Sequence, residues 1–118
     1  MNELRLCESD FRFMSVIWDN EPLPSGELVK LCNEKFDWKK STTYTMLKKM
    51  CEKGFAENDG SLVTSLIDRD SVQAYASEHF VEQTFAGSLP NFLVSFLGGK
   101  KISEKEAEEL KRLIDSHK

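Results

Sequence analysis

Lysine and hydroxyl side chains are concentrated in one short segment, residues 39–53. Five lysines lie there against one acidic residue, Glu52, so the segment has a net charge of +4 in a chain whose total is -4. Hydroxyls can donate hydrogen bonds to phosphates and base edges, and lysines neutralise phosphates. The side chains that could do this chemistry are Lys39, Lys40, Ser41, Thr42, Tyr44, Thr45, Lys48 and Lys49.

The same composition also fits the solvated face of a structural helix. Small basic clusters are common on protein surfaces. The pI of the whole chain, about 5.2, gives no support to a nucleic-acid partner. Charge alone therefore leaves both interpretations open.

Catalytic and metal-binding patterns are not visible in the sequence. Its three cysteines, Cys7, Cys32 and Cys51, are widely spaced and form no CxxC pair, and its two histidines, His79 and His117, lie far apart. This spacing indicates neither a zinc site nor a disulfide framework. No nucleophile–base pairing is visible either. We expect no catalytic residue, no metal and no cofactor, and a protein that is not an enzyme.

Length and composition indicate a globular protein of one ordinary domain, or of a small domain with an appendage. The chain has 118 residues, of which 40% are hydrophobic and 31% charged. No apolar run approaches the ~20 residues that span a bilayer, and the N-terminus resembles no secretory signal. We expect a cytoplasmic protein without membrane insertion.

Helical periodicity dominates the first half of the chain. The first predicted helix starts from capping oxygens in residues 8–10 and ends before two prolines. The second starts near Ser25 and is interrupted at residues 36–38. The third covers about residues 41–53, with Gly54 at the position of a left-handed cap. The basic segment therefore forms the third helix.

A short β-hairpin is predicted after this helix. The strand-like segments 55–58 and 61–67 flank Asp59-Gly60, a pair typical of two-residue hairpin turns. Three helices followed by a hairpin is the order of a winged helix-turn-helix, in which the helix before the hairpin enters the DNA major groove. This order favours the nucleic-acid interpretation of the third helix.

Three further helices are predicted beyond the hairpin. The first opens at the capping-box spacing of Asp70 and Gln73, and the other two are capped by Ser88 and Ser103. Their apolar faces either fold back onto the N-terminal core or pair with a second copy, and we favour the homodimer. The side chains expected at this dimer interface are Phe80, Phe85, Leu89, Phe92, Leu93, Phe96, Leu97, Leu110, Leu113 and Ile114.

The predicted fold is mainly α. A winged helix-turn-helix with a short β-hairpin occupies residues 1–69, and a helical dimerisation region occupies residues 70–118.

Three blocks of sequence carry a resemblance to a known family. They are Ser9-Asp10-x-x-x-x-Met14-x-Val16-Ile17-Trp18, then Trp38-x-x-Ser41-Thr42-x-x-Thr45-x-Leu47-x-Lys49-x-x-x-Lys53-Gly54-Phe55, and Phe85-x-Gly87-Ser88-Leu89 followed by Ile102-Ser103-x-x-Glu106-x-x-Glu109-Leu110. In this order they resemble the penicillinase-repressor (BlaI/MecI/CopY) family of bacterial transcriptional regulators, over roughly residues 8–115.

The resemblance implies a winged helix that binds a palindromic DNA operator as a dimer and represses transcription. In family members linked to antibiotic sensing, an upstream sensor protease triggers cleavage in the C-terminal region, and copper-responsive members take up metal through a C-terminal cysteine motif. The partners implied are therefore double-stranded DNA, a second copy of the chain and an upstream sensor protein. The DNA-contacting positions carried over are Ser41, Thr42, Tyr44 and Thr45, with Lys48 and Lys49 nearby.

The sequence departs from the family pattern at several positions. The wing is shorter than usual, and residues 57–70 hold four acidic side chains against Arg69 alone, which disfavours contact with phosphate. Tyr44 stands where many members have a basic residue. The Asn-Phe step cut in sensor-linked members aligns with Ser95-Phe96, and the tail has no Cys-x-Cys motif. The alternative hypothesis is a winged-helix protein-interaction module that has lost DNA binding.

Overall fold

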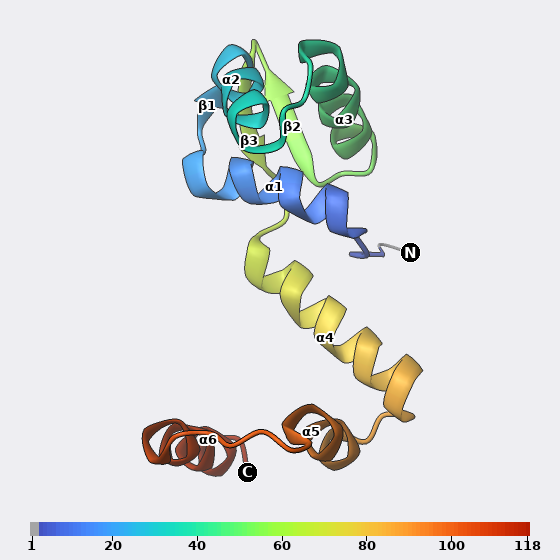
Figure 1. Ribbon diagram of the computed structural model, residues 1–118. Helices are drawn as coiled ribbons and strands as arrows, with labels where there is room; N and C mark the ends of the chain where they lie inside the picture. The colour runs from blue at the N-terminus through green and yellow to red at the C-terminus, as the bar shows by residue number, and fades with distance from the viewer. Residues whose placement is uncertain (1–2) are drawn as a thin grey trace. The chain divides into compact units, whose positions relative to one another are not determined.

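The computed structural model describes residues 3–118 (Figure 1). The predicted mainly α content is confirmed, with one small antiparallel sheet. In chain order the elements are α1 (Glu8–Asn20), β1 (Leu23–Pro24), α2 (Ser25–Phe36), α3 (Lys40–Glu52), β2 (Ala56–Asp59), β3 (Leu62–Ser65), α4 (Arg69–Phe85), α5 (Leu89–Leu97) and α6 (Glu104–Ser116).

The chain forms two compact units, of which the first ends at His79 and the second begins at Phe80. The boundary falls inside α4, whose first turns belong to the N-terminal unit because Val72 is 1% exposed in its core. The division predicted from sequence, between residues 69 and 70, stays a prediction. No helix within residues 3–118 is long and apolar enough to cross a bilayer.

Apolar faces of α1, α2, α3, the sheet and α4 meet in the core of the N-terminal unit. In Figure 1, α1 runs across the base of this unit, and α2, α3 and the sheet stand on it. Since α3 is held by its inner face, its outer face is left in solvent. The buried side chains are Phe13, Met14, Val16, Ile17, Leu23, Leu28, Cys32, Leu47, Met50, Phe55, Ala56, Val63 and Val72.

The hairpin turn differs from the sequence prediction by one residue. Asp59 lies opposite Leu62 in the β2–β3 ladder, so the loop consists of Gly60 and Ser61, both of which have positive φ. Asp59 is therefore the last strand residue and not the first turn residue. The register follows from burial, because a shift by one residue would turn Val63 out of the core.

The sheet has a third strand, β1, that the sequence pattern does not predict. The strand order is β1-β3-β2, and Leu23 pairs with Val63. Pro24, which lacks an N–H donor, is tolerated because β1 is an edge strand. The two prolines that end α1 thus also flank a buried strand residue, Leu23.

The N-terminal caps predicted for the last three helices are found at α5 and α6 but not at α4. The side chains of Ser88 and Ser103 accept hydrogen bonds from backbone N–H groups of α5 and α6 at 3.1 Å, as predicted. At α4 the prediction is wrong. Asp68, and not Asp70, accepts the N–H of Ser71 at 2.9 Å, so the helix begins at Arg69.

The C-terminal unit leaves its apolar side chains in solvent. The rings of Phe80, Phe85 and Phe92 pack edge to face with centroids 5.6–6.1 Å apart. Around this cluster every side chain of α5 and α6 is at least partly exposed. Phe96 is 57% exposed and Leu113 is 56% exposed. An apolar surface of this kind is typical of an interface.

Candidate nucleic-acid interface

Packing of α3 separates its buried residues from the residues predicted to bind DNA. Thr43, Leu47 and Met50 face the core and are at most 2% exposed. The eight side chains predicted to contact DNA are all exposed. Exposure is necessary for an interface, although a solvated face would also show it. The arrangement of the eight side chains is therefore more informative.

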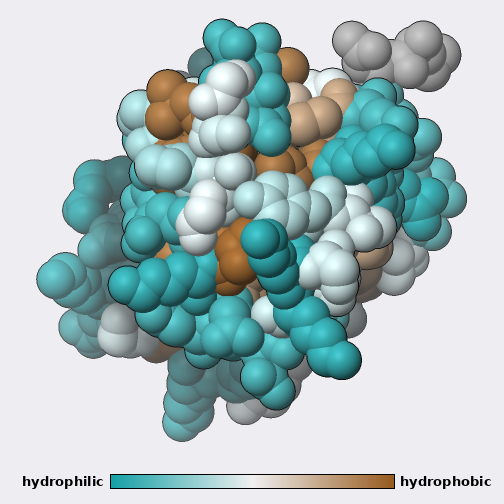
Figure 2. Space-filling model, turned by 90° about the horizontal axis from the view of Figure 1, so that it is seen from above, coloured by the Kyte–Doolittle hydropathy of each residue, from teal (hydrophilic) through white to brown (hydrophobic). Residues whose placement is uncertain are grey.

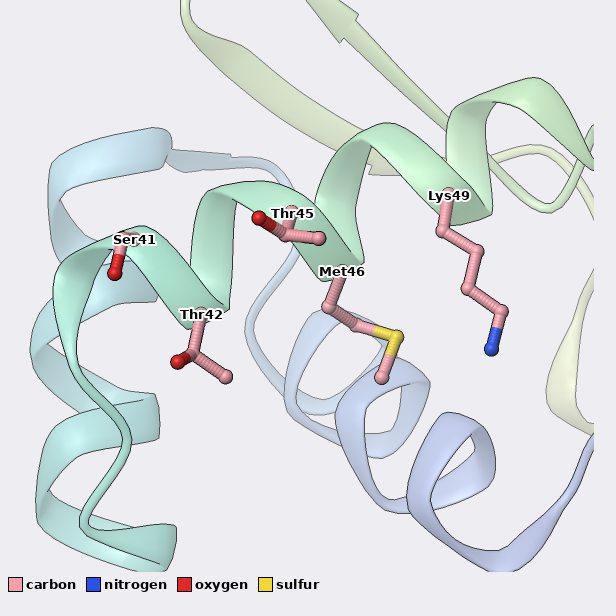
Figure 3. Close-up of a pocket in the computed structure, with 5 residues that line it drawn as sticks. All are labelled: Ser41, Thr42, Thr45, Met46 and Lys49. Atoms are coloured by element: carbon pink, nitrogen blue, oxygen red, sulfur yellow. The ribbon is translucent and has the colours of Figure 1, made fainter.

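One row of α3 residues lines a shallow hollow of about 290 Å³. Figure 3 shows its lining residues, with Thr42, Met46 and Lys49 projecting from the same side of the helix. The row offers hydroxyl donors from Ser41, Thr42 and Thr45 beside the apolar Met46. Hydroxyls and apolar side chains are among the groups that contact base edges and thymine methyls in a major groove.

Met46 was not among the residues selected from sequence. It is half-buried, so its apolar character fits a core position equally well. The signal that could have found it is its spacing, since it lies four residues after Thr42 and therefore on the same side of the helix.

Tyr44 and Lys48 lie on a different side of α3, next to the wing. They line a groove of about 540 Å³ together with residues of β2, including Glu57 and Asn58. The Tyr44 hydroxyl lies 3.3 Å from the hydroxyl of Ser25, the first residue of α2. The structure thus divides the predicted DNA-binding residues of α3 between two rows and does not bring Lys48 together with Lys49.

Lys49 makes an ion pair with a buried carboxylate of α1. Its ammonium donates to Oδ1 of Asp10 at 3.0 Å, and the ammonium of Lys53 lies 3.8 Å from Oδ2. The hydrogen bond from Lys49 to Asp10, together with the negative charge of that carboxylate, raises the pKa of Lys49.

Asp10 does not act as the predicted capping residue of α1. The N-cap position of this helix is Cys7, whose side chain makes no capping hydrogen bond.

Lys39, Lys40 and Lys48 are the cations of the basic segment that make no ion pair within residues 3–118. Figure 2 views the N-terminal unit from above and shows a mostly hydrophilic face with small hydrophobic patches. On the wing, Glu57 and Asp59 are exposed, so the predicted acidic character of the wing reaches the surface. The surface around α3 is thus basic on the helix and acidic on the hairpin.

Candidate ligands for a metal do not gather in the described part of the chain. No three His, Cys, Asp or Glu side chains within residues 3–118 lie close enough to hold an ion. Cys32 is buried, and this burial raises the pKa of its thiol. Cys51 is half-buried and Cys7 is exposed.

A family model described as "Penicillinase repressor" matches residues 6–116 of this chain. The chain belongs to the penicillinase-repressor family. This confirms the resemblance read from the three sequence blocks.

Members of the penicillinase-repressor family match over nearly their whole length. The penicillinase repressor of Bacillus licheniformis is 25% identical in an alignment 118 residues long that covers 97% of this chain and 92% of that protein. The methicillin resistance regulatory protein MecI of Mammaliicoccus sciuri is 19% identical in an alignment 114 residues long that covers 93% of this chain and 93% of that protein.

A solved structure of the family supports the fold. The solution structure of the monomeric form of B. licheniformis BlaI in complex with the blaP half-operator aligns with a TM-score of 0.50 and 24% identity. The alignment covers 59% of this chain and 92% of that structure. The predicted winged helix-turn-helix is confirmed.

Proposed function

We propose that this protein is a transcriptional repressor that binds a palindromic DNA operator as a homodimer. The observation that carries the proposal is the exposed row of hydroxyls on α3, set beside lysines in a winged helix of the penicillinase-repressor family. The related B. licheniformis BlaI was solved with a half-operator, which supports DNA as the class of partner.

In the proposed complex α3 lies in the major groove. Ser41, Thr42 and Thr45 donate to base edges and phosphates, and Met46 provides the apolar contact. Lys39, Lys40 and Lys48 neutralise phosphates on either side of the groove. The acidic wing contributes little to affinity, because Glu57 and Asp59 repel the DNA backbone.

The second copy is proposed to bind through the C-terminal unit. A single winged helix reads few base pairs, and two-fold pairing doubles the site and makes it palindromic, with half-sites about 34–36 Å or a multiple apart. The apolar side chains proposed to be covered by this pairing are the ten expected from sequence: Phe80, Phe85, Leu89, Phe92, Leu93, Phe96, Leu97, Leu110, Leu113 and Ile114.

Repression follows from occupancy, because a dimer on its operator excludes polymerase from the promoter. The inducing signal is proposed to come from an upstream sensor protein, as the family implies. The protein is proposed to work as a binding protein rather than as an enzyme, in the cytoplasm where its DNA is found.

The test is sequence-preferring binding to the promoter region of the protein's own gene. Electrophoretic mobility should be measured on this DNA and on a scrambled duplex, between about 50 and 200 mM salt. The double variant Thr42→Ala plus Thr45→Ala should lose the preference for the promoter and keep the salt dependence, because hydroxyls carry base contacts and not charge.

The control is Thr84→Ala, an exposed helical threonine outside the winged unit, which should bind as the unmodified protein does. A dimer that shows no preference for the promoter over scrambled DNA at moderate salt would contradict the proposal. That result would favour the protein-interaction module instead, a function for which the acidic wing is the supporting observation.

A further inference from the structure

Asp10 is a buried carboxylate placed between two lysines of α3. Its side chain is 3% exposed, whereas those of Lys49 and Lys53 are 48% and 43% exposed. The two lysines are four residues apart, so they project from the same side of the helix toward the first turn of α1. In Figure 3 the side chain of Lys49 extends from α3 in the direction of α1.

Burial makes this carboxylate dependent on its cations. Removing an ionised carboxylate from water is costly, and a buried charge persists only where it is paired and hydrogen-bonded. Lys49 supplies the hydrogen bond at 3.0 Å, and Lys53 supplies the more distant charge at 3.8 Å. If Lys49 moved to a DNA phosphate, Asp10 would keep only the weaker of its two partners.

We infer that Asp10 holds Lys49 and Lys53 as positioning residues of α3, so that the phosphate contacts of this helix fall to Lys39, Lys40 and Lys48. This inference rests on the proposed DNA-binding function and assigns the lysines within it. It changes the role expected for Lys49 from a DNA contact to a contact between α3 and α1.

The ion pair also borders the hollow that is proposed to read bases. Lys49 lines that hollow together with Thr42, Thr45 and Met46. Because Asp10 lies on a separate helix, the pair adds a polar contact between α3 and α1 to the core packing of Thr43, Leu47 and Met50. The pair therefore supports the orientation of α3 that core packing sets, and it removes one unit of positive charge from the DNA-binding surface.

The experiment compares two neighbouring lysines by the salt dependence of promoter binding. Lys48→Met and Lys49→Met each remove one charge and keep most of the apolar stem. Lys48→Met should reduce the slope of log affinity against log salt by about 1. Lys49→Met should leave the slope unchanged, reduce the preference for promoter over scrambled DNA, and lower the melting temperature. Lys49→Arg should restore both the preference and the melting temperature.

Asp10→Asn supplies a second, independent arm. It frees both lysines from the carboxylate, so the salt slope should rise by about 1 to 2 as they become available to phosphates. Asparagine keeps the size of the side chain and one acceptor oxygen for Lys49, so this variant remains informative if Lys49→Met does not fold. A slope that falls with Lys49→Met as it does with Lys48→Met, or that stays unchanged with Asp10→Asn, would overturn the inference.

Failure of the proposed function would give a different result. If the unmodified protein shows no salt-dependent DNA binding, thermal unfolding still tests the positioning role. The melting temperatures of Asp10→Asn, Lys49→Met and the double variant should then be non-additive, because the two side chains act as one pair. Additive effects would refute the positioning role by themselves.

Discussion

Replacing Phe96 by alanine should weaken self-association of the protein by roughly 15- to 300-fold. Phe96 is 57% exposed in the single chain, on the apolar face of α5. Full burial of a phenylalanine side chain is worth about 1.5 to 3 kcal/mol, so the exposed part is worth about 0.9 to 1.7 kcal/mol. A homodimer carries the substitution twice, so the loss of binding free energy is twice this value. Each 1.4 kcal/mol of that loss is a factor of ten in the dissociation constant.

The assay is sedimentation velocity over a wide range of protein concentration, with circular dichroism to verify that the helices are retained. The matched control is Val94→Ala on the same helix. Val94 is 74% exposed, which is more than Phe96. It lies two residues before Phe96 in the helix, and this spacing places it on another side of α5. This control should change the dissociation constant by less than about threefold.

Two results would refute this reasoning. An unchanged dissociation constant for Phe96→Ala would mean that the face of α5 is not the interface. An equal loss with Val94→Ala would mean that apolar exposure, and not the particular face, determines association. If the unmodified protein stays monomeric at every concentration, the homodimer proposal itself fails.

Three further outcomes are expected for the N-terminal unit and the start of α4. Hydrogen bonds from the hydroxyl and backbone N–H of Ser71 hold the pKa of Asp68 below its ordinary value of 3.8. Asp68→Ala should therefore lower the melting temperature at neutral pH, with a difference that shrinks as pH falls through the lowered pKa, and calorimetry showing equal melting at neutral pH would contradict the capping role. Leu47→Ala should cost about 2 to 5 kcal/mol of unfolding free energy in urea, and a loss below about 1 kcal/mol would contradict its burial at 2% exposure. Gly54→Ala should cost about 1 kcal/mol because its φ of +83° is left-handed while the space for a Cβ is open, and Gly54→Asn should recover part of this loss in the same urea experiment.

Elements that depend only on neighbouring residues could be predicted from the amino-acid sequence. The helices capped by Ser88 and Ser103 begin where predicted, because a cap joins groups three residues apart. The second helix begins at Ser25 for a similarly local reason, since Pro24 at its N-cap position has extended backbone and a fixed φ. The family was also accessible, because its three blocks lie within continuous stretches of chain.

Contacts between distant residues decided the features that the sequence did not reveal. Leu23–Pro24 becomes a strand only because β3 offers it an edge to pair with. The turn shifts to Gly60-Ser61 because Val63 must face a core built by other elements.

Asp10 is the clearest case of a role decided by tertiary structure. From sequence it was a candidate cap for its own helix, and Lys49 was a candidate DNA contact. The fold brings these residues, 39 positions apart, to within 3.0 Å and buries the carboxylate. Charge and spacing along the chain identified a basic helix. Packing, which buries Asp10, decided which of its lysines pair with a carboxylate: Lys49 and Lys53 lie 3.0 Å and 3.8 Å from Asp10.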